Sequence, residues 1–256
     1  MLKKLFSHPL TRRLDIDAPR CTELRSSVIQ NKAFLRQIYI NWYKSLIMLL
    51  PPGEGPVLEL GSGSGFLKDF IPNLLTSDIF QIKGIDFVLD GQRLPFKDTS
   101  LQGIVMVDVL HHIHDVTSFL AEAARCIKPG GLIVMVEPWV TRGSALVYRY
   151  LHHEPYHPET KKWDFAEGGP LSQANLALPW LIFARDRKEL ERRFPKLRIQ
   201  QVTLHSPFCY LLSGGVSLRS LLPGCLFETC RQIENMLMPW MGSLAMFATI
   251  ALVRVK

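Results

Sequence analysis

The segment from Val57 to Leu67, VLELGSGSGFL, joins a short apolar run to three alternating glycines, and a carboxylate stands directly ahead of them. A glycine-rich turn leaves the backbone bare and often holds a phosphate group. Glu59, however, would repel the negative charge of a pyrophosphate. The segment therefore favours a ligand that has a positive centre and carries no phosphate.

Two common phosphate-binding patterns fit this segment poorly. The dinucleotide pattern places a third glycine three positions after the second, and Phe66 stands there instead. The P-loop pattern ends in Gly-Lys followed by Ser or Thr, and the chain contains no such ending. An NAD(P)-dependent oxidoreductase is thus an alternative that the residues disfavour, and it predicts binding of NAD(P).

Further polar residues follow later apolar runs. Asp78 ends NLLTSD, Asp90 ends GIDFVLD, Asp108 lies within GIVMVDVL and Glu137 follows LIVMV. Ligands of open α/β sheets bind at the carboxyl ends of the strands. These acids are therefore candidates for one common site.

Two histidine clusters are candidates for acid–base chemistry, because imidazole exchanges protons near neutral pH. His111 and His112 follow the fourth apolar run, and His153 and Glu154 lie in the segment HHEPYHP. Each of these four residues is a candidate general base or substrate contact, and Glu137 is a further one.

A cluster of His and Glu residues can also bind zinc. In HHEPYHP, however, His152 and His153 are adjacent, and Pro155 would disrupt a helix that placed His153 and His157 on one face. We therefore expect no metal site.

The chain alternates short apolar strands with helices, which indicates an α/β fold with a doubly wound, mostly parallel sheet covered on both faces. The separation between the second and third strands, residues 79–83, is shorter than the crossover of about a dozen residues that parallel strands normally need. Any helix there must be shrunken, or the two strands are short and offset. The expected strands are 57–60, 73–78, 84–90, 103–110, 132–138, 197–204 and 244–255, and the expected helices are 23–50, 64–70, 115–127 and 185–194.

Several motifs follow one another in a characteristic order. Glu59-x-Gly61-x-Gly63-x-Gly65 is followed by Asp78, by LDGQRLPF (89–96), by VDVLHHI (107–113) and by LAEAARCIKPGGLIVMVEP (120–138). Over roughly residues 55–138 the chain resembles the class I S-adenosylmethionine-dependent methyltransferases of the type 11 group. The resemblance implies a Rossmann-like, seven-stranded sheet whose seventh strand is antiparallel. It also implies transfer of a methyl group by in-line displacement, in which the enzyme mainly aligns the reactants.

The resemblance further implies a cofactor site. The backbone of Gly61–Gly65 would lie against the methionine and ribose portions of S-adenosylmethionine, and Asp78 would accept hydrogen bonds from the ribose hydroxyls. Asp90 would accept from the adenine amino group, and Asp108 would lie at the methionine end. The cofactor-binding candidates are Glu59, Gly61, Ser62, Gly63, Gly65, Asp78, Asp90, Gly91, Gln92 and Asp108.

We interpret residues 1–256 as a single methyltransferase domain. It would carry an N-terminal helical extension (1–52), an insert after strand five (139–184) and an apolar insert between strands six and seven (206–243). The resemblance leaves open which acceptor is methylated; a small molecule, either apolar or lipid-linked, is the favoured class. A methyltransferase-like binding module without catalysis is another alternative, and it predicts cofactor binding without turnover.

The composition indicates where the protein acts and which partners it has. The chain is 47% hydrophobic and 21% charged, and its net charge is +7. The odd number of cysteines, five, without a CxxC pair favours a reduced, cytoplasmic protein. The basic N-terminus and the apolar segment 207–227 raise the hypothesis of peripheral membrane contact. Met241–Val253 is too short for the roughly 20 residues that span a bilayer. The dispersed basic residues argue against nucleic acid, and the oligomeric state is not indicated.

Overall fold

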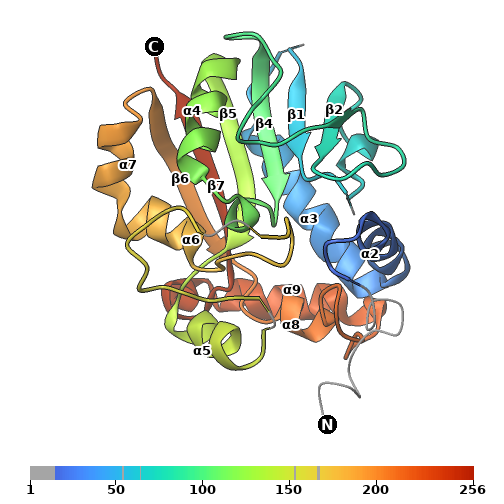
Figure 1. Cartoon of the computed structure of the whole chain (residues 1–256). Coiled ribbons are helices and arrows are strands. Elements are labelled where there is room, and N and C mark those ends of the chain that lie inside the picture. Colours follow the sequence, from blue (N-terminus) through green and yellow to red (C-terminus); the bar gives the residue numbers. More distant parts are fainter. Residues whose placement is uncertain (1–14, 54, 64, 153, 166–167) are drawn as a thin grey trace.

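The seven strands form one sheet with the order β3-β2-β1-β4-β5-β7-β6 (Figure 1). The computed structural model describes the chain except residues 1–14, 54, 64, 153 and 166–167. The strands are β1 (Val57–Leu60), β2 (Leu74–Asp78), β3 (Phe87–Val88), β4 (Leu101–Val107), β5 (Ile127–Pro138), β6 (Leu197–His205) and β7 (Phe247–Arg254).

Four neighbouring strand pairs are parallel and two are antiparallel. β1 pairs in parallel with β2 and β4, β2 with β3, and β4 with β5, whereas β7 runs antiparallel to both β5 and β6. All four residues of β1 are buried, as expected for a strand covered on both faces. The predicted Rossmann-like sheet with an antiparallel seventh strand is therefore confirmed.

One face of the sheet is covered by α4 (Val116–Cys126), α6 (Leu178–Trp180) and α7 (Arg187–Arg193) (Figure 1). Asp115 begins α4 as its N-cap, because its carboxylate accepts a hydrogen bond from the Ser118 N–H at 3.1 Å. Phe119 and Ile104 belong to the core between this layer and the strands, and both are fully buried.

The opposite face is covered by α3 (Ala33–Leu49), whose Tyr43 packs in a second core with Val105 and Val134. The single helix expected over 23–50 is in fact two helices, because α2 (Pro19–Asn31) ends at Lys32, where the backbone is extended (φ −91°, ψ 91°). The Lys32 ammonium donates to the carbonyls of Gly215 and Leu218. These contacts hold the junction against the C-terminal insert.

Two elements near the glycine turn are shorter than expected. The helix predicted over 64–70 is only the 3-10 turn η1 (Leu67–Asp69), and the third strand is only β3. No helix lies between β2 and β3, where all residues are described. Asp86 explains the short link, because its carboxylate accepts from both the N–H and the hydroxyl of Thr76 at 2.9 Å and so ties the loop back to β2.

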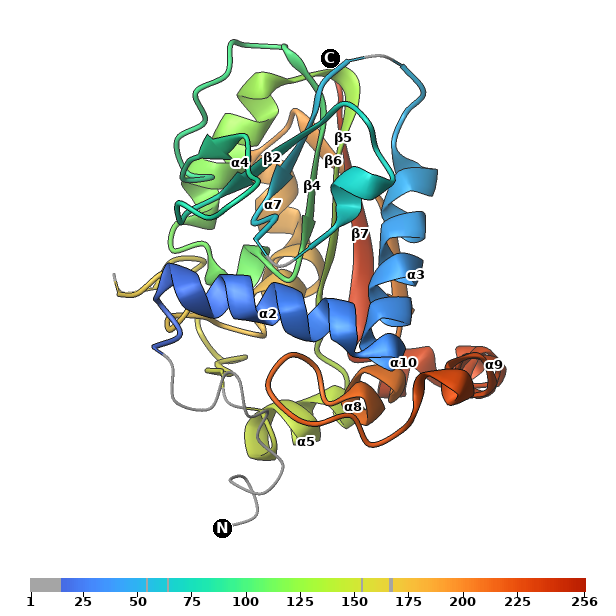
Figure 2. The same ribbon diagram turned by 90° about the vertical axis from the view of Figure 1, so that its right-hand side faces the viewer.

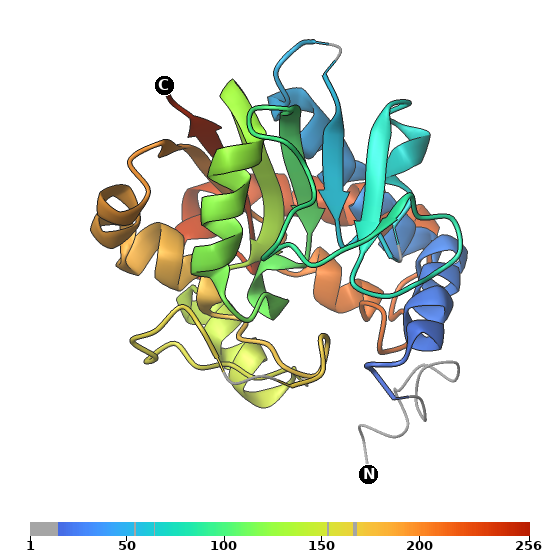
Figure 3. The same ribbon diagram turned by 45° about the horizontal axis from the view of Figure 1, so that its top comes forward.

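The two inserts lie at the end of the sheet where the parallel strands terminate (Figures 2 and 3). Part of the second insert packs as core: Phe227 makes an edge-to-face contact with Phe34 of α3, with ring centroids 5.3 Å apart. No helix in the described part of the chain is long and apolar enough to cross a membrane. The remaining elements are η2 (Leu110–His112), α5 (Arg142–Tyr150), η3 (Leu181–Arg185), α8 (Cys209–Ser213), η4 (Gly224–Leu226), α9 (Phe227–Met236), η5 (Met238–Trp240) and α10 (Met241–Leu244).

Candidate active site

The glycine turn after β1 has a backbone that side chains would not tolerate. Gly61 has φ +65°, and a Cβ placed there would lie 2.5 Å from Val109 Cγ2. A Cβ at Gly63 would lie 2.6 Å from Asp78 Oδ2 and 2.4 Å from Thr22 Cγ2. The absence of a side chain thus lets Asp78 reach the Gly63 N–H, whose hydrogen bond to Oδ2 is 3.1 Å long.

Two buried carboxylates, Glu59 and Asp78, accompany this turn. Burial raises the pKa of Glu59 to about 7; a hydrogen bond from Ser62 opposes the rise and the Asp78 charge adds to it. Burial also raises the pKa of Asp78, against hydrogen bonds from the N–H groups of Phe80 and Gly63. Among the described residues, neither carboxylate forms an ion pair with Lys or Arg. Their negative charge therefore faces the turn without a cationic partner.

Residues of α2 and α3 contact the glycine turn, although the sequence predicted this region only as a helical extension. Tyr43 accepts a hydrogen bond from the Phe66 N–H at 3.1 Å. Thr22 is buried against Gly63, and its hydroxyl has no hydrogen-bond partner among the described residues. The apolar periodicity of 23–50 predicts a helix there, but it does not indicate which loop the helix will contact.

The second predicted group of cofactor residues forms a local loop after β3. Asp90 Oδ1 accepts from the Gln92 N–H at 2.9 Å, and the Gln92 amide donates to both oxygens of Asp90. Gln92 Oε1 accepts from the Asp115 N–H at 3.0 Å, which ties the loop to the start of α4. Gly91 lies against the core, where a Cβ would be 3.4 Å from Leu60.

A buried ionisable cluster lies at the ends of β4 and β5. Glu137 is fully buried, and its Oε1 accepts from the N–H groups of Val109 and Leu110 at 2.9 and 2.7 Å. Its Oε2 lies 2.8 Å from Nδ1 of His111, which is also fully buried. Because a carboxylate only accepts hydrogen bonds, Nδ1 of His111 carries a proton, and Nε2 is the nitrogen that faces the cluster.

Nε2 of His111 lies 3.6 Å from Glu154 and 4.0 Å from Asp108. Burial alone would lower the pKa of His111, but the hydrogen bonds to Glu137 and Glu154 raise it well above the usual value. Burial would raise the pKa of Glu154, but His111 lowers it well below the usual value. The pair is therefore an imidazolium beside a carboxylate.

His112 and Asp108 complete the cluster. Burial and the His111 charge lower the pKa of His112 to about 3, and its Nδ1 lies 3.1 Å from the Gln173 carbonyl. Burial raises the pKa of Asp108 to about 7, with His111 opposing the rise. Asp108 also has φ +63°, a conformation that Asp and Asn tolerate better than most residues.

Of the predicted acid–base candidates, the structure brings together His111, His112 and Glu154, while His153 lies outside the described residues. One ligand atom from each of these three lies within 4.8 Å of the others, a set that could hold a metal ion. The sequence argument against a metal considered only the segment 152–157. Glu154 folds back onto His111 and His112 after β4, and local spacing does not predict this contact because it joins residues far apart in the chain.

A cluster of aromatic side chains joins α3, α8 and β7. Trp42 stacks on Tyr210, with ring centroids 5.7 Å apart, and Tyr210 contacts Phe247 at 4.8 Å. Burial raises the pKa values of Tyr39 and Tyr210, and the Asp108 charge adds to both shifts. The Asp108 charge therefore acts on Tyr39 and Tyr210, while Trp42 and Phe247 are buried in the core.

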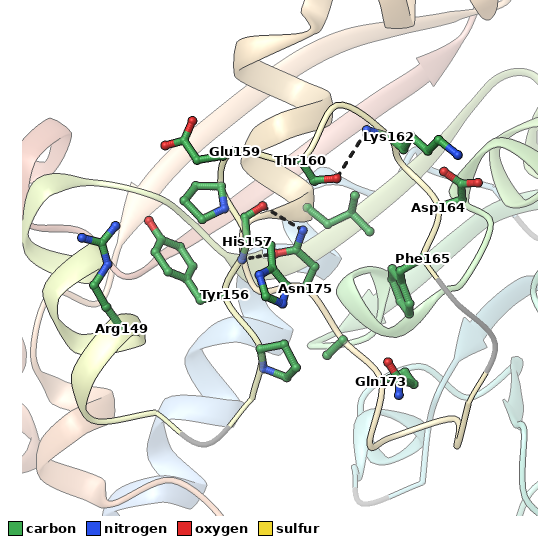
Figure 4. A pocket seen from close by; sticks show the side chains of 14 residues that line it. Arg149, Tyr156, His157, Glu159, Thr160, Lys162, Asp164, Phe165, Gln173 and Asn175 are labelled. Atoms are coloured by element: carbon green, nitrogen blue, oxygen red, sulfur yellow. Dashed lines mark hydrogen bonds between the residues drawn. The ribbon is translucent and has the colours of Figure 1, made fainter.

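A separate pocket opens on the first insert, as Figure 4 shows. Asn175 holds it together: its Oδ1 accepts from the His157 N–H at 2.9 Å, and its amide donates to the His157 carbonyl at 3.2 Å. The Asn175 N–H also donates to the His111 carbonyl at 2.9 Å. None of the predicted cofactor residues lines this pocket. Asn175 therefore connects this pocket to the backbone of His111 in the buried ionisable cluster.

The strand order, the glycine turn after β1 and the acids near the strand ends are the features expected of an α/β methyltransferase fold. Residues 58–135 match the family model described as "Methyltransferase domain". Residues 58–135 are thus similar to the class I S-adenosylmethionine-dependent methyltransferases, and the match covers the segment that carries the turn, the acids and most of β5.

Curated relatives match over the same region. The chain is 33% identical over 104 residues to the ubiquinone/menaquinone biosynthesis C-methyltransferase UbiE of Desulfotalea psychrophila, covering 34% of this chain and 42% of the relative. It is 27% identical over 133 residues to the phthiotriol/phenolphthiotriol dimycocerosates methyltransferase of Mycobacterium tuberculosis, covering 45% and 47%. The chain thus spans less than half the length of these relatives.

Solved structures show the same fold over nearly the whole chain. The geranyl diphosphate C-methyltransferase of Streptomyces coelicolor superposes with a TM-score of 0.52 at 14% identity, covering 98% of this chain and 90% of that one. A methyltransferase of Haloferax volcanii in complex with the activator Trm112 also has a TM-score of 0.52 at 14% identity, covering 91% and 96%.

Proposed function

We propose that the chain transfers a methyl group from S-adenosylmethionine to a small-molecule acceptor that is apolar or lipid-linked. One observation carries the proposal: Glu59 and Asp78 are buried beside the glycine turn, Asp108 directly precedes Val109, which lies against Gly61, and no Lys or Arg ion pair with these three acids occurs among the described residues. Buried negative charge of this kind attracts a cationic ligand. When bound, the cofactor supplies an electrophilic methyl group on a sulfonium cation.

Each cofactor-binding residue has a role in this proposal. Gly61, Ser62, Gly63 and Gly65 present backbone to the methionine and ribose portions, and Glu59 holds negative charge beside the turn. Asp78 accepts from the ribose hydroxyls, and Asp90, with the backbone of Gly91 and Gln92, receives the adenine. Asp108 lies at the methionine end, close to the base cluster. The fit rests on Gly61, Gly63 and Gly65, where neighbouring atoms leave no room for a side chain, and on the acids beside them.

His111 is the proposed general base, and Glu137 is its positioning residue. The 2.8 Å contact to Glu137 keeps the proton on Nδ1 and directs Nε2 toward Asp108 and Glu154. A positive charge placed beside Asp108 lowers the pKa of His111 by electrostatic repulsion. His111 must then pass its Nε2 proton to Glu154, 3.6 Å away, before Nε2 can accept a proton from an acidic hydroxyl or carbon acid of the acceptor. His112 and Glu154 border the same space and contact the acceptor in this proposal.

The acceptor class follows from the surroundings and from the relatives. Trp42, Tyr210 and Phe247 form an aromatic cluster, and the Asp108 charge acts on its Tyr210. Apolar ligands bind in sites that are mostly aromatic and hydrophobic with a few fixed polar groups. The relatives named for quinone and phthiotriol dimycocerosate substrates support an apolar or lipid-linked acceptor. Nucleic acid is not expected as a substrate.

Calorimetry with S-adenosylmethionine tests the cofactor site. We expect Asp78→Ala to weaken binding by about 1–3 kcal/mol, the loss when a hydrogen bond to a charged group is removed, which is roughly 5- to 150-fold in Kd. Glu191→Ala on the outer surface of α7 is the matched control and should bind normally. Binding of NAD(P) instead of S-adenosylmethionine would contradict the proposal.

Turnover tests the second half of the proposal. Radiolabelled methyl transfer should be followed with isoprenoid quinones and phenolic glycolipid precursors presented in mixed micelles. Methylated product from an apolar acceptor, abolished by His111→Ala with cofactor binding intact, is the expected result. Cofactor binding without turnover on any acceptor would identify the chain as a binding module.

A further inference from the structure

Seven large apolar side chains are exposed at one end of the molecule. Two segments contribute them, α5 with the following Leu151, and the stretch from the end of α9 to α10. We call this surface the apolar end face. It comprises Leu146 (64% exposed), Tyr150 (66%), Leu151 (67%), Met236 (76%), Met238 (67%), Trp240 (57%) and Leu244 (36%). Single exposed apolar residues are ordinary, but a clustered set marks an interaction site.

The two segments are packed together. A Cβ at Gly143 of α5 would lie 3.2 Å from the Ser243 carbonyl oxygen and 3.3 Å from Leu244 Cα, so α5 directly contacts α10. Figure 2 shows α5 and α10 at the same end of the molecule. The apolar end face is therefore one surface, although its parts lie about 90 residues apart in the sequence.

α5 is a firmly anchored helix that exposes one of its faces. Arg142, Leu146, Arg149 and Tyr150 follow helical spacing and share its outer face. Tyr148 on the inner side is buried, and its hydroxyl donates to the Met246 carbonyl. A capping box at the first turn fixes the start of the helix. The apolar side chains are thus presented to the outside by fixed backbone.

The charges of this surface are all positive. Within residues 142–151 and 236–244, the charged side chains are Arg142 and Arg149, both exposed, and there is no carboxylate. Trp and Tyr beside Arg are the side chains that anchor proteins in the headgroup region of a bilayer. A second copy on the same face would bring four arginines together without a compensating acid. Charge therefore favours an anionic lipid surface.

We propose that the apolar end face binds peripherally to anionic membranes. The face continues directly into the candidate active site, because α5 leads through Leu151 to Glu154, which lies 3.6 Å from His111. Docking on this face turns the first insert toward the bilayer, the source of a lipid-linked acceptor. That consequence for the acceptor rests on the proposed function, whereas membrane binding itself does not.

Cosedimentation with vesicles tests the proposal. The full chain should bind vesicles that contain phosphatidylglycerol and phosphatidylcholine, bind pure phosphatidylcholine vesicles less, and dissociate as salt is raised. The double variant Leu146→Ser/Trp240→Ser should lose at least about tenfold in vesicle affinity. The reason is that two large apolar side chains, which the bilayer would bury, are removed from the face. Met48→Ser is the matched control, because Met48 is 85% exposed on α3 and outside the face.

Three results would overturn the proposal. One is no binding of the wild-type chain to anionic vesicles at low salt. The second is undiminished binding by the double variant. The third is a wild-type dimer in light scattering that the double variant converts to monomer, which would assign the face to a second copy. Calorimetry with S-adenosylmethionine on the same samples separates the two proposals, because failure of cofactor binding leaves the vesicle result unaffected.

Discussion

The substitution Glu137→Gln tests most directly the contact between Glu137, at the end of β5, and His111, which follows β4. In the native chain Oε1 of Glu137 accepts from two backbone N–H groups, and Oε2 faces Nδ1 of His111 at 2.8 Å. The glutamine carbonyl can keep both backbone bonds. Its amide then presents N–H to Nδ1, so His111 must lose its Nδ1 proton and keep only the one on Nε2, to avoid two donors facing each other.

The change in free energy can be estimated from the contacts that remain. The variant keeps two neutral hydrogen bonds and loses one bond between charged groups, which contributes about 1.5–3 kcal/mol. Because Glu137 raises the pKa of His111, this stabilisation is complete below the ordinary pKa of histidine and is lost as the pH rises through the raised value. The variant should therefore be less stable by that amount near pH 6, and the difference should shrink in alkaline buffer.

Two measurements follow from this reasoning. Denaturant unfolding at several pH values gives the stability difference, and nitrogen-15 NMR of the His111 ring reports which nitrogen carries the proton. We also expect methyl transfer to fall by about 10²- to 10⁴-fold, the usual contribution of a general base, while S-adenosylmethionine still binds. A His111 ring that keeps its proton on Nδ1 in the variant would refute the assigned role of Glu137.

Three further predictions concern the cofactor site. Because the pKa of Asp108 is about 7, its charge is lost below that pH; affinity for S-adenosylmethionine should rise from pH 6 to 8 by calorimetry, and Asp108→Asn should reduce this slope. Gly63→Ala should weaken binding at least tenfold, since its Cβ would collide with Thr22 and Asp78, whereas Gly242→Ala, with open space, should bind normally in the same assay. Tyr43→Phe should lower the free energy of unfolding in urea by about 1 kcal/mol, as the buried Phe66 N–H loses its acceptor; an unchanged midpoint would contradict this.

The sequence predicted the central sheet well because buried parallel strands are continuous apolar runs. β1, β2 and β4 were expected within three residues of where they lie, and the acids that end them meet at one edge of the sheet for the same reason. β3 was overestimated, because the alternation in GIDFVLD suggests a strand while the Asp86–Thr76 bonds make the loop turn early.

Contacts between distant segments could not be predicted in this way. The encounter of Glu154 with His111 and the burial of Thr22 against Gly63 depend on how an insert and an N-terminal helix fold back over the sheet. Local patterns carry no information on such packing. The helical period of 23–50 likewise gave no sign of the break at Lys32, since the residue's extended backbone is fixed by carbonyls of the C-terminal insert.

The break at Lys32 has a consequence for the rate of turnover. α2 covers the glycine turn through Thr22, and Asp17, two residues before the helix, accepts from the N–H groups of Leu171 and Ser172 at 2.8 and 2.9 Å. If S-adenosylmethionine binds at the glycine turn as proposed, we predict that the spent cofactor leaves past this cover only when those bonds open and the 13-residue helix swings about Lys32. Product residence time, and with it the steady-state rate, should then depend on solvent viscosity and on the length of the Asp17 side chain.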